Sequence, residues 1–157
     1  MREVIYKILV FLGLINEKKE IIREETIYQK RNLMTNYEYK FYQNIKELED
    51  EYQIVPQLNL AAVTKKINNN RYYSELFRNI DFAIFSKDYQ ELLLLIEIND
   101  QTHNNYNRRD RDMKVKKICN DIGVKLITFY TKYPNEKTYV INRIKNELDT
   151  YKELTKV

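Results

Sequence analysis

Hydrophobic residues recur along the chain with two different periods, and the changes of period predict the order of helices and strands. Apolar positions spaced three and four residues apart indicate three helices, over about 35–51, 108–122 and 137–153. Short apolar runs rich in branched residues indicate four strands, over 53–63, 79–86, 91–98 and 124–130. A polar segment, 64–77, stands between the first two strands and predicts a loop or short helix.

Three local signals support these boundaries. Thr35 and Glu38 have the spacing of a capping box at a helix start. Gly123 stands where a helix-ending glycine belongs. Pro56, which cannot donate a hydrogen bond to a neighbouring strand, indicates that the first strand lies at an edge or carries a bulge.

The strand at 91–98 is apolar on both faces, so we expect it at the centre of a covered sheet. It should form a hairpin with 79–86 and pair in parallel with 124–130, because a helix connects it to that strand. The predicted fold class is therefore α/β, with a mixed sheet of about four strands flanked by helices. An extra N-terminal helical segment, residues 1–31, would precede a main domain at 32–157.

The N-terminal segment combines an apolar run, 4–15, with a charged stretch, 16–31, that reads as an exposed helix. Twelve helical residues reach about 18 Å, short of the roughly 30 Å hydrocarbon core of a membrane. Lys7 interrupts the run, and no small-residue cleavage site follows it. The favoured interpretation is a packing element or a homodimer surface within residues 1–31. Membrane-surface contact and the remnant of a longer anchor are the less favoured alternatives.

The composition changes this picture only modestly. A chain of 157 residues suits one core, and a formal charge of +4 is compatible with a polyanionic partner. The single cysteine, Cys119, excludes an internal disulfide and a cysteine-rich zinc site, and it reads as a small buried hydrophobe. We expect a reducing cytoplasm, and the abundance of lysine, asparagine and isoleucine is typical of AT-rich bacterial or phage genomes. Some of the fourteen tyrosines could stack on bases, whereas most should cap the edge of the core.

Two carboxylates mark the candidate chemistry. Asp81 begins one strand of the predicted hairpin and Glu97 ends the other, so the two side chains should converge at one edge of the sheet. Like charges in a partly dry place need compensation, and Mg²⁺ or Mn²⁺ held by both carboxylates and the carbonyl of Ile98 would supply it. Alternatively, Asp81 bonds a turn amide or pairs with Arg78, and Glu97 emerges into solvent.

The segments "DFAIF", "LLIEINDQTH" and "RRDRDMKVKKICNDIGVKLITF" carry a resemblance to the PD-(D/E)xK, or restriction-endonuclease-like, superfamily. Within it the chain is similar to small bacterial domains of unknown function related to very-short-patch-repair endonucleases. The resemblance covers about residues 33–130. The matching positions are Glu38, Phe41, Tyr42, Asp81, Phe82, Ile96, Glu97, Asp100, His103, Arg111, Asp112 and Gly123.

This resemblance implies a restriction-endonuclease-like core and Mg²⁺-dependent (or Mn²⁺-dependent) hydrolysis of DNA, as an endonuclease or nickase, with RNA as the alternative substrate. Asp81 and Glu97 would hold the metal. Glu38 would be an outer ligand, or only the capping glutamate. His103 would act as general acid/base or contact the phosphate, or only bond the backbone of its loop.

One position departs from the superfamily pattern. Asn99 stands where many members carry a catalytic lysine, so the positive charge would have to come from the following helix, where Arg111, Lys114 or Lys117 could supply it. Those three residues, together with Arg108 and Arg109, form the densest basic stretch and are expected to contact phosphates. Without such a charge the domain would be a degenerate member that binds nucleic acid or protein.

A fourth acidic residue, Asp112, has two interpretations. It stands four residues before Lys116, a spacing typical of a surface ion pair on a helix. It also borders the apolar stripe of the same helix, so it could instead orient His103 or an arginine.

Overall fold

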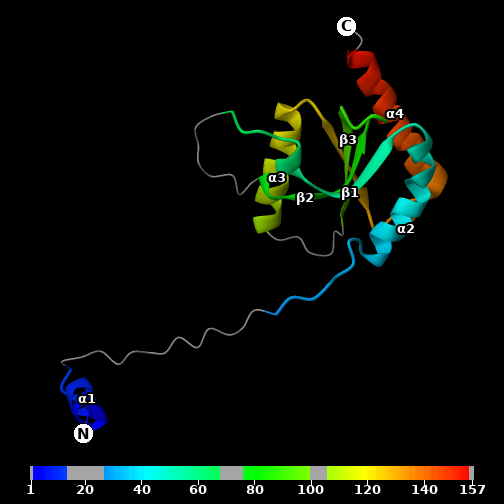
Figure 1. The fold of residues 1–157 in the computed structure, drawn as a ribbon. Helices are drawn as coiled ribbons and strands as arrows, with labels where there is room; N and C mark the ends of the chain where they lie inside the picture. The colour runs from blue at the N-terminus through cyan, green and yellow to red at the C-terminus, as the bar shows by residue number, and fades with distance from the viewer. Residues whose placement is uncertain (1, 14–26, 68–75, 100–105, 156–157) are drawn as a thin grey trace. The chain divides into compact units, whose positions relative to one another are not determined.

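Four strands form a mixed sheet at the centre of the main domain (Figure 1). The computed structural model describes residues 2–13, 27–67, 76–99 and 106–155, with the backbone alone at 2, 3 and 6 and over 106–111. The strand order is β1-β2-β3-β4, with the first two pairings antiparallel and the last parallel. The bounds are β1 Gln53–Asn59, β2 Asn79–Phe85, β3 Leu92–Asn99 and β4 Lys125–Tyr130. The predicted hairpin, the central strand and the parallel step are confirmed.

Helices cover both faces of the sheet (Figure 1). One face packs against α2 and α4, around side chains such as Phe41, Phe82 and Ile144. The other face packs against α3, around Leu95, Val115 and Cys119. The helix bounds are α2 Asn36–Ile45, α3 Tyr106–Asp121 and α4 Lys137–Thr155. The α/β fold class is therefore confirmed.

The local signals at helix ends act as expected. Thr35 Oγ1 accepts a hydrogen bond from the Glu38 N–H at 3.3 Å, and Glu38 Oε2 accepts one from the Thr35 N–H at 2.5 Å. The helix begun there continues as a 3₁₀ turn over Lys46–Asp50, so it reaches nearly the predicted end. Gly123 has φ +70°, a conformation that glycine adopts without steric cost.

Two predicted extents are wrong. The first strand ends at Asn59 rather than 63, because Asn59 Oδ1 accepts a hydrogen bond from the Ala61 N–H at 3.1 Å and turns the chain into a 3₁₀ helix, Leu60–Ala62. The charged stretch 16–31 is not helical over 27–31; its residues 16–26 lie outside the described part. Ile27 is 89% exposed, so no apolar packing supports a helix there.

The chain divides into two units, Met1–Arg31 and Asn32–Val157. The first contains α1, Arg2–Phe11, whose exposed side chains include Val4, Ile5, Ile8 and Phe11. Among the described residues, no helix combines the length and apolar character needed to cross a membrane. The role of this apolar helix stays a prediction.

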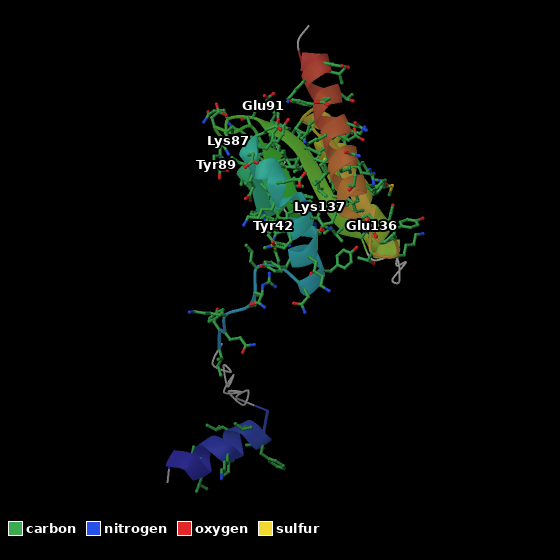
Figure 2. The ribbon with its side chains drawn as sticks, turned by 90° about the vertical axis from the view of Figure 1, so that its right-hand side faces the viewer. Tyr42, Lys87, Tyr89, Glu91, Glu136 and Lys137 are labelled. Carbon is green, nitrogen blue, oxygen red and sulfur yellow. The ribbon has the colours of Figure 1, made fainter. Side chains whose placement is uncertain are left out.

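The two ends of the sheet carry different features (Figure 2). The β2–β3 turn, with Lys87, Tyr89 and Glu91, lies at one end, whereas Glu136 and Lys137 mark the start of α4 at the other. Because β3 and β4 run in parallel away from the turn, both end on the α4-start side. This is the end of the sheet that carries the candidate site.

Candidate active site

A pocket of about 350 Å³ opens where the β2–β3 backbone ladder stops. The last paired residues at this end are Phe82 and Ile96. One residue before Phe82, the Asp81 carboxylate accepts a hydrogen bond from the Ile98 N–H, with 2.6 Å between Oδ2 and N. In a continued ladder, a backbone carbonyl of β2 would accept the hydrogen bond from this N–H. Here the Asp81 side chain accepts it instead, and the two strands separate to leave the pocket.

The pocket walls bring together most of the predicted site residues that the structure describes. Asp81, Glu97 and Asn99 all line it, and all three are half-buried. Glu97 therefore does not simply emerge into solvent, and Asp81 bonds a strand amide rather than a turn amide. The full lining is Phe77, Arg78, Asn79, Asp81, Glu97, Ile98, Asn99, Asp112 and Val115.

Glu38 performs the capping role and also reaches the strands. Its Oε1 accepts a hydrogen bond from Gln57 Nε2 at 3.1 Å, while its Oε2 caps the start of α2. Gln57 has φ +53°, and the β1–β2 register skips it between Pro56 and Leu58. The pairing keeps the same register before and after Gln57, so no residue is inserted there, and β1 lies at the edge of the sheet as Pro56 suggested. The sequence analysis missed Gln57, because the sequence did not indicate the positive φ that places its amide at Glu38.

The surroundings of Asp81 disfavour its charge. Burial, the largest cause, raises the pKa of Asp81 to about 7. The Ile98 N–H opposes this rise, whereas the neighbouring carboxylates of Glu38 and Glu97 add to it. An acidic group that is costly to ionise, beside two others, is the electrostatic setting in which a cation is stabilising.

The same arrangement limits what could hold that cation. Within the described ranges, no three histidine, cysteine, aspartate or glutamate side chains converge closely enough to hold a metal ion. Glu38 raises the pKa of Asp81 by its charge and by a side-chain hydrogen bond, and its oxygens also serve Thr35 and Gln57. Mg²⁺ needs only one or two protein carboxylates and keeps several waters, so Asp81 and Glu97, with the oxygens of Asn99 and Ile98, are a fitting donor set.

The α3 side of the pocket contributes Asp112 as well as Val115. This placement favours the pocket-facing interpretation of Asp112 over a purely solvent-facing one. Glu97 lines the same pocket as these two α3 residues. Burial first and Glu97 second raise the pKa of the Cys119 thiol to about 11, and this side chain is 1% exposed. Cys119 is thus the small buried hydrophobe that was predicted.

The expected sources of positive charge are placed less favourably. Lys117 Nζ bonds Asp121 Oδ2 at 2.5 Å on the exposed side of α3, and Lys114 is exposed and is not among the lining residues. The side chains of Arg108, Arg109 and Arg111 lie outside the described part, as do Asp100 and His103. Arg78, by contrast, lines the pocket from the β2 side.

The chain was compared with known proteins at three levels. Residues 30–150 match the model of a family described as a protein of unknown function, DUF2726. No curated protein matches the chain, and no solved structure does.

Proposed function

Because the chain belongs to the DUF2726 family, whose description attaches no activity to it, we propose a function from the pocket itself: metal-dependent hydrolysis of phosphodiester bonds in DNA. The fold would then be a member of the restriction-endonuclease-like, PD-(D/E)xK class. The observation that carries this proposal is the meeting of Asp81 and Glu97 in one half-buried pocket at the end of a rigid central strand pair.

Five residues at or near the pocket would have a role in this reaction. Asp81 and Glu97 would hold Mg²⁺ or Mn²⁺, and Asn99 and the Ile98 carbonyl would offer neutral oxygens beside them. When bound, such a metal polarises a phosphoryl oxygen and lowers the pKa of a bound water. Glu38 orients Asp81 electrostatically. In the reaction the hydroxyl of water joins phosphorus and the bond to one ester oxygen breaks, with a proton going to that oxygen.

The missing lysine is compensated in this proposal by Arg78. Asn99 brings no charge, but Arg78 lines the same pocket and carries a guanidinium suited to a phosphate. Arg78 is expected to stabilise the negative charge that develops on the phosphate. The helix residues Lys114 and Lys117 are expected to contact the DNA backbone farther from the pocket.

A second candidate function is a binding module without catalysis. Two observations favour it: Asn99 in place of lysine, and the lack of any three-ligand metal group among the described residues. In that case the domain would bind nucleic acid or a protein, and the pocket would catalyse no reaction.

Cleavage of supercoiled, linear duplex and single-stranded DNA, in Mg²⁺, Mn²⁺ or EDTA, distinguishes these two functions. Asp81→Asn and Glu97→Gln keep the shape of each side chain and remove its charge, and Glu153→Gln, at an exposed position on α4, is the matched control. We expect metal-dependent cutting by the wild type and the control, and at least a hundredfold loss in both pocket variants. No cutting by a folded wild type, without a metal-induced rise in Tm, would refute the nuclease and leave the binding module.

A further inference from the structure

A pair of tyrosines stands directly beside the candidate site. Tyr130 is the register partner of Asn99 in the parallel β3–β4 pairing, so the two residues lie on neighbouring strands. The Thr131 N–H donates to the Asn99 carbonyl at 3.1 Å, which continues the connection past the end of β4. The chain then turns, and Tyr133 comes back against Tyr130, with 6.5 Å between ring centroids and 77° between ring planes.

A lysine completes this cluster. Lys132 Nζ lies 5.8 Å from the Tyr130 centroid and 5.0 Å from the Tyr133 centroid. Tyr133 is 55% exposed and Lys132 is exposed, so both side chains are accessible to a ligand. We call Tyr130, Lys132 and Tyr133 the aromatic platform.

The platform is held in place by a buried amide. Asn135 is only 6% exposed and has φ +47°, a conformation that is unusual for a residue other than glycine. Its Nδ2 donates to the Tyr37 hydroxyl at 2.8 Å and to the Tyr130 carbonyl at 3.0 Å. The turn that carries Tyr133 is therefore fixed to both β4 and α2, and little ordering should be needed when a ligand binds.

A groove of about 490 Å³ continues from the platform. Tyr139, which is 54% exposed, lines it together with Arg143. The guanidinium of Arg143 stacks on Phe129 at 4.7 Å and donates to the Thr128 carbonyl at 3.2 Å. Aromatic faces that alternate with fixed positive charge are the chemistry that binds an unpaired strand, whose bases stack while its phosphates meet cations.

We propose that the aromatic platform and its groove, on the α4 side of the sheet, bind single-stranded nucleic acid. A strand bound there would reach the candidate pocket, on the α3 side, around the common end of β3 and β4, so the substrate of that pocket would be a strand with unpaired bases. Paired bases in a duplex hide the faces that Tyr133 would stack on, so a duplex could use only Lys132 and Arg143. The assignment of a substrate rests on the proposed function, whereas the binding surface does not.

Fluorescence anisotropy in EDTA tests the binding surface without cleavage, with a labelled 20-nucleotide thymidine strand and a mixed-sequence duplex of equal length. Tyr133→Leu removes the ring, and Tyr133→Phe keeps it. Tyr89→Leu is the matched control, because Tyr89 is a 56% exposed tyrosine on the β2–β3 turn at the opposite end of the sheet (Figure 2). We expect Tyr133→Leu to weaken binding of the single strand roughly tenfold or more, with Tyr133→Phe and Tyr89→Leu close to wild type.

The salt dependence gives a second readout. Lys132→Gln should reduce the slope of log K against log salt by about 0.7, the value for one phosphate contact on a single strand. Equal affinity for the duplex and the single strand, or an unchanged affinity of Tyr133→Leu, would overturn the platform. If the platform binds the single strand but the wild type cuts neither single-stranded nor duplex DNA, the proposed nuclease falls and the platform stands. If Asp81→Asn loses cutting while Tyr133→Leu binds the single strand normally, the aromatic platform falls and the proposed nuclease stands.

Discussion

The Asp81→Asn substitution should stabilise the metal-free protein at pH 8 and leave its stability at pH 4 nearly unchanged. The folded protein raises the pKa of Asp81 from 3.8 to about 7. Between those values the folded state binds more protons than the unfolded state, so the free energy of unfolding falls as pH rises. Above pH 7 both states are ionised and the penalty is complete. Asparagine carries no charge and avoids that penalty.

The size of the effect follows from the two pKa values. They differ by about three pH units, 7 minus 3.8, and each unit corresponds to about 1.4 kcal/mol. The full penalty would thus be about 4 kcal/mol, which solvent in the open pocket reduces, so we expect ~2 kcal/mol. The Ile98 N–H keeps an acceptor, because the asparagine Oδ1 can take the place of the carboxylate oxygen.

Urea unfolding in EDTA, followed by circular dichroism from pH 4 to pH 8.5, measures this difference. Asp88→Asn is the control of opposite sign. A hydrogen bond from Ser86, followed by one from the Gln90 N–H, lowers the pKa of Asp88, so that this carboxylate favours folding above pH 3.8 and the contribution is lost as pH falls. A loss of stability in Asp81→Asn at pH 8 would show that the carboxylate serves the fold, and would refute the electrostatic reasoning.

Three further predictions follow from other contacts. Glu38→Gln should lower the pKa of Asp81, which carbon-13 NMR of the Asp81 carboxyl group measures. The helix cap should survive, because glutamine also serves in a capping box. An unchanged pKa of Asp81 would contradict the proposed influence of Glu38. Cys119 should react with iodoacetamide at pH 8 at least a hundredfold more slowly than in 8 M urea, because burial and its raised pKa disfavour the thiolate; fast labelling of the folded protein would refute its burial. Gly123→Ala should cost about 1 kcal/mol in urea unfolding, since its φ of +70° disfavours a side chain even though a Cβ would meet nothing within 4 Å. Gly123→Asn should cost less, and equal costs for the two variants would argue against a conformational cause.

Sequence reasoning succeeded where neighbours along the chain decide the outcome. The cap at Thr35, the stop at Gly123 and the continuous apolar run in β3 all depend on residues that are close together along the chain. It failed at residues 60–63, where the Asn59 side chain competed with the strand ladder. It failed again at residues 27–31, where charge and period suggested a helix but no packing surface supports one.

The candidate site, too, could be predicted from the sequence only in part. The hairpin pattern alone placed Asp81 and Glu97 at one end of the sheet, because side-chain alternation and an antiparallel pairing leave little choice. The electrostatics needed coordinates: the neighbour that adds most to the burial effect at Asp81 is Glu38, from a helix 43 positions earlier in the chain. The hydrogen bond from Gln57 to Glu38 likewise depends on a positive φ at Gln57 that the sequence did not indicate.

By itself, then, the sequence determined the order of elements, the mixed sheet and the pair of carboxylates at its end. Only the tertiary structure decided that Arg78 and Asp112 share the pocket with those carboxylates, and that Tyr133 folds back on Tyr130 beside Asn99. The physical reason is the distance along the chain over which each interaction acts. Hydrophobic period and caps act over a few residues, whereas charge, burial and ring contacts act between segments that only the folded chain brings together.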